Sequence, residues 1–376
     1  MDVIPSYPPV HFGPGAIKQL NEWLISKSLR NPLIISDRGL SDAGVVDTVL
    51  GVLSLELRAS TFCGISENPT FGCVEGAVEI YRENDCDCIV GVGGGSVLDA
   101  GKALRIVTNH DLPLLEYLQN PSLISDNVAA YATVPTTAGT GAEVTFGGGI
   151  HPVANAPPLG LRSVYLRPDI AFCDPNLTIS LPPKLTAATG MDALVHCIEG
   201  YLSTNTNLPA EAIALDGIAR ASQHVQRAVT DGNDLIARTN MLMAALEGGM
   251  AIYMGLGPVH ALSMAFGDSP LHHGTLVTVC TPPVMREFNE ISGDKLNRIA
   301  SAMEIEVGGA VGHRIADAIA KLNNDMGLPS SVAEMGYTGR SLEEVVEAAH
   351  SNWFNDTSPK KFTKSVYKNI ISGLLS

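Results

Sequence analysis

Short apolar runs alternate with amphipathic stretches through the first half of the chain. Runs rich in β-branched residues predict buried strands at Pro32–Ser36, Cys88–Val92 and Tyr131–Val134. Stretches with apolar positions every three or four residues predict helices at Ala16–Ser26, Phe71–Arg82 and Val97–Val107. Because predicted strands and helices alternate, we expect a mainly parallel sheet with helices on both faces.

The pattern changes after Asp174-Pro175. From Leu181 onward the apolar positions repeat with a period near 3.6, as in LPPKLTAATGMDALVHCIEGYLS, which predicts an all-helical second half. The tandem Pro182-Pro183 suits the first turn of a helix and marks the boundary. We therefore predict an α/β domain over residues 1–179 and an all-helical domain over residues 180–376, with the ligand site in the cleft between them.

Composition and charge narrow the functional classes. The 376 residues are 45% hydrophobic, enough for a large core and for more than one compact unit. A net charge of −15 disfavours binding to nucleic acid or to anionic membranes. Neither a membrane span nor a signal peptide is visible, so we expect a cytoplasmic enzyme. The seven cysteines are then reduced, and Cys86 and Cys88 are expected on one face of a strand as core residues.

A glycine-rich turn joins a predicted strand to a predicted helix in GVGGGSVLDAGKAL, residues 91–104. Gly93, Gly94 and Gly95 followed by Ser96 would let backbone N–H groups approach a phosphate at the start of a helix, where the helix dipole is positive. The segment is neither GxGxxG nor a P-loop, so by itself it indicates a phosphate or pyrophosphate site. The alternative is a tight structural turn.

A second loop, PTTAGTGAEVT, follows another predicted strand and offers the hydroxyls of Thr136, Thr137 and Thr140. Two such loops at strand ends favour a dinucleotide over a single phosphate. Asp37 ends a third strand, where a carboxylate can accept both ribose hydroxyls and repel a 2′-phosphate, which favours NAD over NADP. The alternative role of Asp37 is a helix cap.

The helical half contains a candidate metal site. Asp192 and His196 are four residues apart and share one helix face, where they form either a buried polar pair or part of a metal site. Downstream, GLGPVHALSMAFGDSPLHHGTL adds His260 and the pair His272-His273. One carboxylate and three imidazoles suit Fe²⁺ or Zn²⁺ and leave a coordination position for a substrate oxygen. Dinucleotide loops in one half and a metal set in the other are typical of a dehydrogenase.

These segments together resemble the iron-containing, or group III metal-dependent, alcohol dehydrogenase family, and most closely its 4-hydroxybutyrate dehydrogenase-like bacterial branch. The resemblance extends from HFGPGAI through GGGSVLDAGK, PTTAGTGAEVT and CDPNLTISLPPKLTAATGMDALVHCIEGY to GLGPVHAL and LHHGTL. It implies a Rossmann-like dinucleotide-binding domain, an all-α metal-binding domain, a Fe²⁺ or Zn²⁺ ion and a homodimer.

The resemblance also assigns residues. It implies metal ligands at Asp192, His196, His260 and His273. The implied cofactor-binding residues are Asp37, Gly93, Gly94, Gly95, Ser96, Asp99, Lys102, Thr136, Thr137, Thr140 and Leu181.

Three positions depart from the family pattern. Met264 stands where many relatives have a second histidine, four residues after the third ligand, and Pro158 stands where a lysine is common. Near the C-terminus, Asn355 stands where the close branch has a histidine, and Ser358-Pro359-Lys360 replaces the usual N-P-R motif. Proton exchange would then use a water on the metal, a cofactor ribose hydroxyl, or an imidazole, with His272 and His151 as the candidates.

Four basic residues, Arg162, Arg167, Lys360 and Lys361, suggest a substrate with an anionic end, although each also suits a solvated surface. The leading hypothesis is an NAD(P)-dependent, metal-dependent alcohol dehydrogenase or aldehyde reductase acting on a short, semialdehyde-like substrate. The alternatives are a non-redox enzyme similar to dehydroquinate synthase, or a catalytically impaired protein that still binds cofactor and metal.

Overall fold

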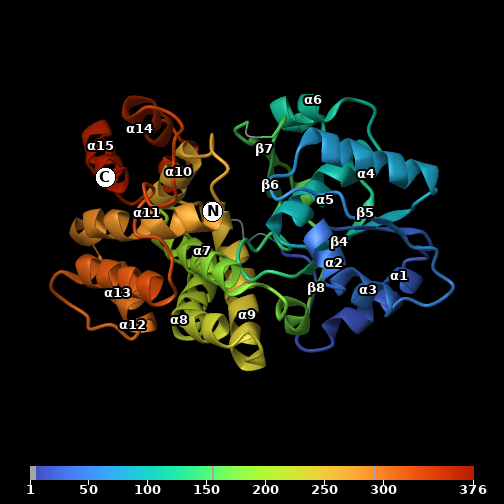
Figure 1. The fold of residues 1–376 in the computed structure, drawn as a ribbon, viewed down its shortest axis with the longest axis horizontal. Helices are drawn as coiled ribbons and strands as arrows, with labels where there is room; N and C mark the ends of the chain where they lie inside the picture. The colour runs from blue at the N-terminus through green and yellow to red at the C-terminus, as the bar shows by residue number, and fades with distance from the viewer. Residues whose placement is uncertain (1–5, 155, 292) are drawn as a thin grey trace. The chain divides into compact units, whose positions relative to one another are not determined.

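The computed structural model describes residues 6–154, 156–291 and 293–376. These residues form two compact units (Figure 1). The α/β unit comprises Ser6–Thr137 and Gly141–Ser180, and the helical unit includes Ala138–Thr140 and Leu181–Ser376.

A six-stranded parallel sheet with the order β1-β8-β5-β4-β2-β3 forms the centre of the α/β unit. Its strands are β1 (Val10–Phe12), β2 (Pro32–Ile35), β3 (Ser60–Phe62), β4 (Cys88–Gly93), β5 (Ala130–Pro135) and β8 (Ile170–Cys173). A separate antiparallel pair consists of β6 (Gly147–Ile150) and β7 (Leu159–Arg162). Its helices are α1 (Gln19–Ser26), α2 (Arg38–Asp42), α3 (Val45–Leu50), α4 (Phe71–Glu83), α5 (Gly95–Val107) and α6 (Leu114–Gln119), with 3₁₀ turns at Ala16–Lys18, Pro121–Leu123, Val164–Leu166 and Pro175–Thr178.

Alternating side chains divide the core of this unit between the two faces of the sheet. Leu33 and Ile35 of β2 pack into one apolar cluster with residues of α4 and α5, whereas Ile34 packs into a second cluster with residues of α1 and α3. All three side chains are fully buried. This arrangement confirms the predicted parallel sheet with helices on both faces.

The two neighbouring cysteines differ from the sequence expectation. Cys88 is the first residue of β4, but Cys86 lies before the strand. Cys86 packs in the cluster of one sheet face and Cys88 in the cluster of the other. The prediction that both share one face was wrong, because strict alternation applies only within the strand. Both thiols are free, as expected for reduced core residues.

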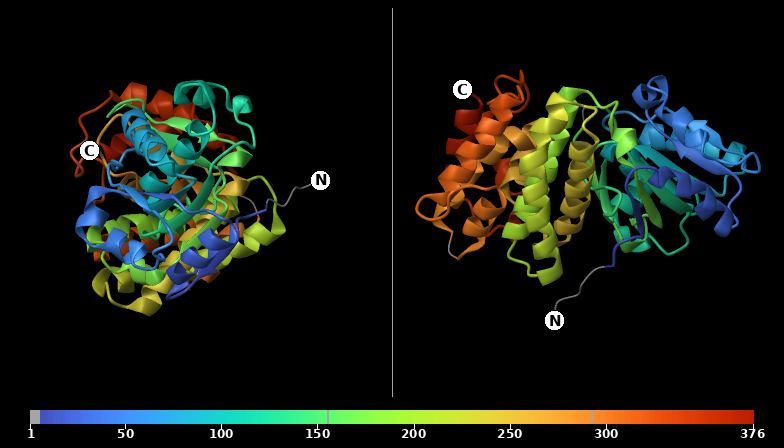
Figure 2. Two further views of the ribbon diagram at one scale, coloured as in Figure 1. Left: turned by 90° about the vertical axis from the view of Figure 1, so that its right-hand side faces the viewer. Right: turned by 90° about the horizontal axis from the view of Figure 1, so that it is seen from below.

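The described part of the helical unit contains helices and 3₁₀ turns and no strand, which confirms the all-α prediction. Its helices are α7 (Pro183–Leu202), α8 (Leu208–Thr230), α9 (Leu235–Ala251), α10 (Pro258–Ala265), α11 (His273–Glu287), α12 (Lys295–Ala302), α13 (Val311–Asp325), α14 (Leu342–His350) and α15 (Lys364–Leu374), with 3₁₀ turns at Ile252–Met254, Phe288–Glu290 and Trp353–Thr357. Figure 2 shows α7, α8 and α9 packed side by side.

Helix α7 is the central element of the helical unit, since it packs against α8, α9 and α11. From Gly190 to Leu202 every one of its residues is buried, including Asp192, His196 and Glu199. A helix that buries three ionisable side chains must give them partners.

Among the described residues no single helix is long and apolar enough to cross a membrane. One bent pair, Leu235–Met254 with Pro258–Ala265, passes that test by length and composition alone.

Candidate active site

The predicted phosphate loop lies at the carboxyl end of β4. Gly93 ends the strand, Gly94 caps the next helix, and α5 begins at Gly95. A Cβ atom on Gly93 would lie 2.5 Å from Cγ2 of Val97, so only glycine fits this close approach. A thirteen-residue helix therefore starts directly at the sheet edge, with backbone N–H groups and a positive dipole available for an anion.

The second predicted loop lies beside the first. Gly93 and Pro135 are register partners at the carboxyl ends of β4 and β5, and the N–H group of Thr136 donates to the Gly93 carbonyl at 3.1 Å. The hydroxyl of Thr136 is buried and has no hydrogen-bond partner among the described residues. A buried polar group without a partner beside a helix N-terminus fits a polar ligand such as a pyrophosphate.

The Asp99-Lys102 pair of α5 is engaged within the protein. The ammonium of Lys102 is fully buried and donates to Asp99 Oδ1 at 3.0 Å, Thr145 Oγ1 at 2.8 Å and the Gly147 carbonyl at 2.7 Å. All three donors of the lysine are thus occupied. The other Asp99 oxygen accepts the N–H of Gly149 at 3.1 Å. The pair therefore holds β6 and its approach against α5, and Lys102 acts as a positioning residue rather than a free cation for a phosphate.

The remaining predicted cofactor residues lie in several places. Asp37 follows β2, is half-buried, and caps α2 by accepting the N–H of Leu40 at 2.9 Å through Oδ1. Asp37 is therefore a helix cap, and its second oxygen, Oδ2, does not take part in the capping hydrogen bond. The Ser96 hydroxyl donates to the Glu67 carbonyl. The Leu181 carbonyl accepts from the Thr186 hydroxyl at 3.2 Å, so its backbone is fixed within the helical unit.

In the helical unit, three predicted metal ligands converge. Ligand atoms of Asp192, His260 and His273 all lie within 4.8 Å of one another. His196 lies beside them, because its Nε2 is 3.8 Å from Asp192 Oδ1 and its ring stacks on His260 with centroids 4.7 Å apart. Helices α7, α10 and α11 thus bring together residues that are up to 81 positions apart (273 − 192).

Two orphaned atoms test whether this group fits a metal. Asp192 Oδ1 and His260 Nε2 are buried, 3.7 Å apart, and neither has a hydrogen-bond partner among the described residues. Unpaired buried acceptors facing one another are unfavourable unless a cation or proton lies between them. A carboxylate with imidazoles is a donor set that suits Fe²⁺ or Zn²⁺. The residues therefore fit a divalent metal ion.

The pKa shifts of Asp192, His196 and His273 agree with this fit, whereas the carboxylates of Asp192 and Glu199 outweigh burial and raise the pKa of His260 to about 9. Burial by itself raises the pKa of Asp192, but the three surrounding imidazoles outweigh it and bring that pKa well below its usual range. Atoms packed around His273 lower its pKa to about 4, although one side of this residue is exposed. Burial likewise lowers the pKa of His196. A deprotonated carboxylate and neutral imidazoles are the forms that bind a metal.

Glu199 is a functional residue that the sequence reasoning missed. Its buried carboxylate accepts the His260 Nδ1–H at 2.7 Å and the backbone N–H groups of Val259 and His260 at 2.7 and 3.3 Å. The ring contact selects the tautomer of His260 whose Nε2 lone pair is free for a metal. The available signal was its spacing, because residues 192, 196 and 199 share one face of a helix.

Both predicted proton carriers make structural contacts. His272 is the N-cap of α11 and accepts the N–H of Thr275 at 3.3 Å through Nδ1. In the α/β unit, His151 Nδ1 lies 2.5 Å from the Ala156 carbonyl and closes its own loop. In both histidines the contact uses Nδ1, and Nε2 does not take part in it.

One departure from the family pattern, Asn355, has a local explanation. Asn355 donates through Nδ2 to the Ala349 carbonyl at 2.8 Å and accepts the Tyr367 hydroxyl at 2.5 Å. These contacts fasten the end of α14 to α15. Met264 is half-buried on α10, and Pro158 is half-buried just before β7.

The four basic side chains proposed for anion binding are engaged elsewhere. Lys360 contacts Glu287 and Glu290, Lys361 donates to the carbonyls of Asn355 and Asp356, and Arg162 lies 5.2 Å from the Phe146 ring centroid. Arg167 donates to the carbonyl and hydroxyl of Ser6. The structure therefore does not support these residues as free anion-binding groups.

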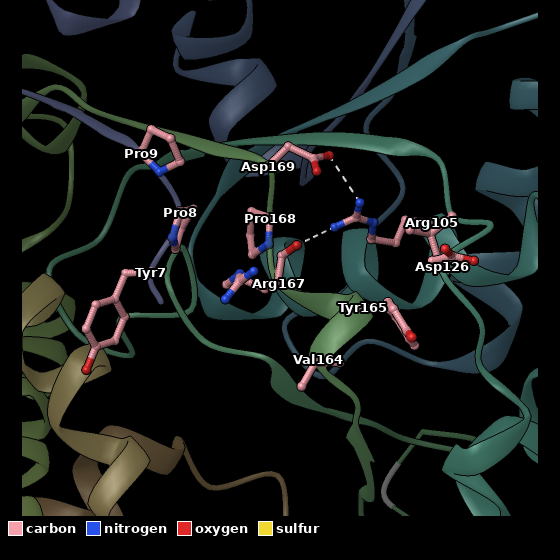
Figure 3. Close-up of a pocket in the computed structure, with 11 residues that line it drawn as sticks. Tyr7, Pro8, Pro9, Arg105, Asp126, Val164, Tyr165, Arg167, Pro168 and Asp169 are labelled. Atoms are coloured by element: carbon pink, nitrogen blue, oxygen red, sulfur yellow. Dashed lines mark hydrogen bonds and ion pairs between the residues drawn. The ribbon is translucent and has the colours of Figure 1, made fainter. Parts of the chain in front are cut away.

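Arg167 also borders a cavity of about 320 Å³ in the α/β unit (Figure 3). Arg105 lines this cavity, and its guanidinium contacts Asp169 Oδ2 at 3.1 Å and the Arg167 carbonyl. The lining residues Pro9, Val128 and Asp169 precede β1, β5 and β8, so the cavity lies at the amino ends of the strands. The glycine loop is at the opposite, carboxyl edge, where ligands of parallel sheets bind.

Comparisons with known proteins cover both units. Residues 8–175 match the family model of the iron-containing alcohol dehydrogenases. Residues 186–375 match the model of the C-terminal part of the Fe-containing alcohol dehydrogenase family. The 4-hydroxybutyrate dehydrogenase of Cupriavidus necator is 37% identical over 96% of this chain and 97% of its own length. The 1,3-propanediol dehydrogenase of Citrobacter freundii is 32% identical, covering 93% of this chain and 92% of its own.

A crystal structure of 1,3-propanediol oxidoreductase is 30% identical and superposes with a TM-score of 0.92 over 99% of this chain and 100% of its own. The chain belongs to the iron-containing alcohol dehydrogenase family. It is accordingly an oxidoreductase of the alcohol dehydrogenase class that uses NAD(H) and a divalent metal ion on an alcohol or aldehyde substrate. The dehydroquinate synthase-like alternative is not favoured by these relatives.

Proposed function

We propose that this protein interconverts a short aldehyde bearing a terminal carboxylate, or a similar anionic group, with the corresponding primary alcohol. The proposal rests chiefly on the relative that is 37% identical over nearly the whole chain, because its name, 4-hydroxybutyrate dehydrogenase, specifies a hydroxy acid. The second candidate is an uncharged short diol, which the names of the 32% identical relatives favour.

In this proposal the helical unit holds the metal through Asp192, His196, His260 and His273. A divalent ion at this position supplies Lewis acidity toward the substrate oxygen. The carboxylate of Asp192 contributes the one negative charge of the set, and Glu199 holds Nδ1 of His260 so that Nε2 faces Asp192. Burial of Asp192, His196 and His260 strengthens these electrostatic contacts, while His273 has an exposed side.

The α/β unit holds the dinucleotide. The N-terminus of α5, opened by Gly93–Ser96, receives the pyrophosphate, and the Thr136 hydroxyl gains the partner that it lacks within the chain. Thr137 follows Thr136 in the same loop, and Thr140, which belongs to the helical unit, is a further candidate. Asp37, one of whose oxygens is not used by the helix cap, accepts the ribose hydroxyls and favours NAD over NADP.

Proton exchange with the substrate is assigned to His272 in preference to His151. His272 adjoins the proposed ligand His273 in the same unit, and its cap contact uses Nδ1 alone. His151 belongs to the α/β unit and is tied to Ala156. We further propose that residues 1–179 and 180–376 act as the cofactor and metal domains of a cytoplasmic homodimer. Support for a dimer comes from β1 and β3, which are the edge strands of the sheet.

The test uses metal-free protein reconstituted separately with Fe²⁺ and Zn²⁺. NADH oxidation is measured with a four-carbon aldehyde ending in a carboxylate and with butanal as its uncharged counterpart. The Asp192→Ala/His196→Ala variant serves as the control without metal ligands. We expect metal-dependent turnover with a preference for the carboxylated aldehyde and no turnover in the control. A preference for butanal or for an uncharged diol would overturn the anionic substrate, and equal turnover in the control would overturn the metal site.

A further inference from the structure

The connection between two proposed metal ligands is short and is held from outside. Helix α10, which carries His260, ends at Ala265, and α11 begins with His273. The seven residues Phe266–His272 therefore form the chain connection between the two helices that carry these imidazoles. Asp268, in the middle of this connector, keeps only 17% of its side chain exposed.

A distant loop supplies partners for the Asp268 carboxylate. The hydroxyl of Tyr337 donates to Oδ1 at 2.9 Å, and the backbone N–H of Arg340 donates to Oδ2 at 3.0 Å. The same N–H lies 2.8 Å from the Tyr337 hydroxyl oxygen. These partners are 69 and 72 residues away in sequence. We call Asp268, Tyr337 and Arg340 the connector clasp.

Packing adds to the clasp on both sides of Asp268. Phe266 is fully buried and meets the Tyr337 ring edge-on, with ring centroids 5.0 Å apart. The Arg340 guanidinium approaches the carbonyl of Ala265, the last residue of α10, at 3.4 Å, where a cation favours the helix dipole. A Cβ atom on Gly339 would lie 2.4 Å from Asp268 Oδ2, so only glycine allows this approach.

We propose that the connector clasp is a positioning element that sets the separation of His260 and His273 before the metal binds. The proposal rests on the proposed function, in which both histidines are ligands. None of the three clasp residues is a proposed ligand, and their contacts fix the backbone between the two. A seven-residue connector without them would sample many conformations, and metal binding would then have to order it.

The test compares metal binding by tyrosine variants. Tyr337→Phe removes only the hydroxyl of the clasp. Tyr117→Phe is the matched control, since its hydroxyl accepts the Leu112 N–H at 3.0 Å in the α/β unit. Each apoprotein is titrated with Co²⁺ against a competing chelator, and the visible absorption of bound Co²⁺ and the apoprotein melting temperature are recorded. We expect Tyr337→Phe to weaken Co²⁺ binding about tenfold and to change the Co²⁺ spectrum. Tyr117→Phe should leave both as in the wild type.

Further variants separate the possible failures. Gly339→Ala should weaken Co²⁺ binding as much as Tyr337→Phe does. If Gly339→Ala does not fold, Asp268→Asn, which keeps the side-chain size, takes its place. A lowered melting temperature with wild-type Co²⁺ affinity and spectrum in Tyr337→Phe would overturn the clasp as a positioning element. Wild-type Co²⁺ binding by His273→Ala would instead overturn the ligand assignment of the proposed function.

Discussion

Replacing Glu199 by glutamine is expected to weaken metal binding without removing any proposed ligand. The carboxylate accepts two hydrogen bonds of 2.7 Å, from the Val259 N–H and the His260 Nδ1–H, and a longer one of 3.3 Å from the His260 N–H. Glutamine has nearly the same shape but offers one acceptor oxygen and an NH₂ group. At least one of the two short contacts would therefore place a donor against a donor.

Two consequences can be worked out from this geometry. A buried donor without an acceptor costs about 1–3 kcal/mol, so the apoprotein should lose roughly that much stability. If the unpaired donor is Nδ1–H, the ring of His260 can move its proton to Nε2, and the lone pair that faces Asp192 is lost. Loss of a partner that orients a metal-binding histidine typically weakens metal binding about 10–100-fold.

The assay is competition for Zn²⁺ between the apoprotein and a chromophoric chelator, together with urea unfolding. Glu347→Gln is the matched control, because Glu347 forms an exposed ion pair with Lys364 at 2.5 Å on α14. We expect Glu199→Gln to lower Zn²⁺ affinity by at least tenfold and the control to leave it unchanged. Zn²⁺ affinity of Glu199→Gln within about twofold of the wild type would refute the tautomer argument.

Three more predictions concern other buried or charged groups. Asp37→Asn keeps a capping oxygen but removes the charge that repels the 2′-phosphate of NADPH. Because like charges ~4 Å apart near a surface repel by about 1–4 kcal/mol, the ratio of kcat/KM for NADPH over NADH should rise about tenfold. An unchanged ratio would contradict the role assigned to Asp37. Burial and a hydrogen bond to Asp216 raise the pKa of Glu247 from 4.5 to about 9. Between these pH values the folded chain retains a proton that the unfolded chain releases. The free energy of unfolding should therefore fall as the pH rises through this range, by at most about 1.4 kcal/mol per pH unit. Urea unfolding of Glu247→Gln should show a flatter dependence, and the wild-type slope in that variant would argue against a shifted Glu247. Lys102→Met leaves Asp99 without its cation and should cost about 3 kcal/mol in urea unfolding and weaken NADH binding, whereas unaltered NADH affinity would remove the positioning role.

Local pattern was sufficient for the fold class and for the shared helix face of two candidate metal ligands. The strands around Leu33, Ile89 and Tyr131 are apolar on both faces, and only a sheet covered on both sides buries them. The i,i+4 spacing of Asp192 and His196 places them on one face of any helix, whatever packs against it. These inferences need no knowledge of distant contacts.

Several shorter elements were beyond this reasoning. Strands β1, β3 and β8 contain only three or four residues, too few for an alternating pattern to stand out. Cys86 lies outside β4, next to Asp85 with its positive φ of 47°, and packs in a different cluster from Cys88. Short elements depend on the neighbouring strand that pairs with them rather than on their own sequence.

The remaining assignments depended on partners far away in the sequence. Glu199 meets His260 across 61 residues and Asp268 meets Tyr337 across 69, and no local periodicity relates such positions. The family resemblance implies a cofactor-binding role for Lys102, yet its three donors are occupied by Asp99, one helical turn away, and by Thr145 and Gly147, more than forty residues away. The sequence by itself determined which chemical groups are present and on which helix or strand they lie. Only the tertiary structure decided which of them are already paired and which stay available to a ligand, because hydrogen bonds and burial depend on distance in space.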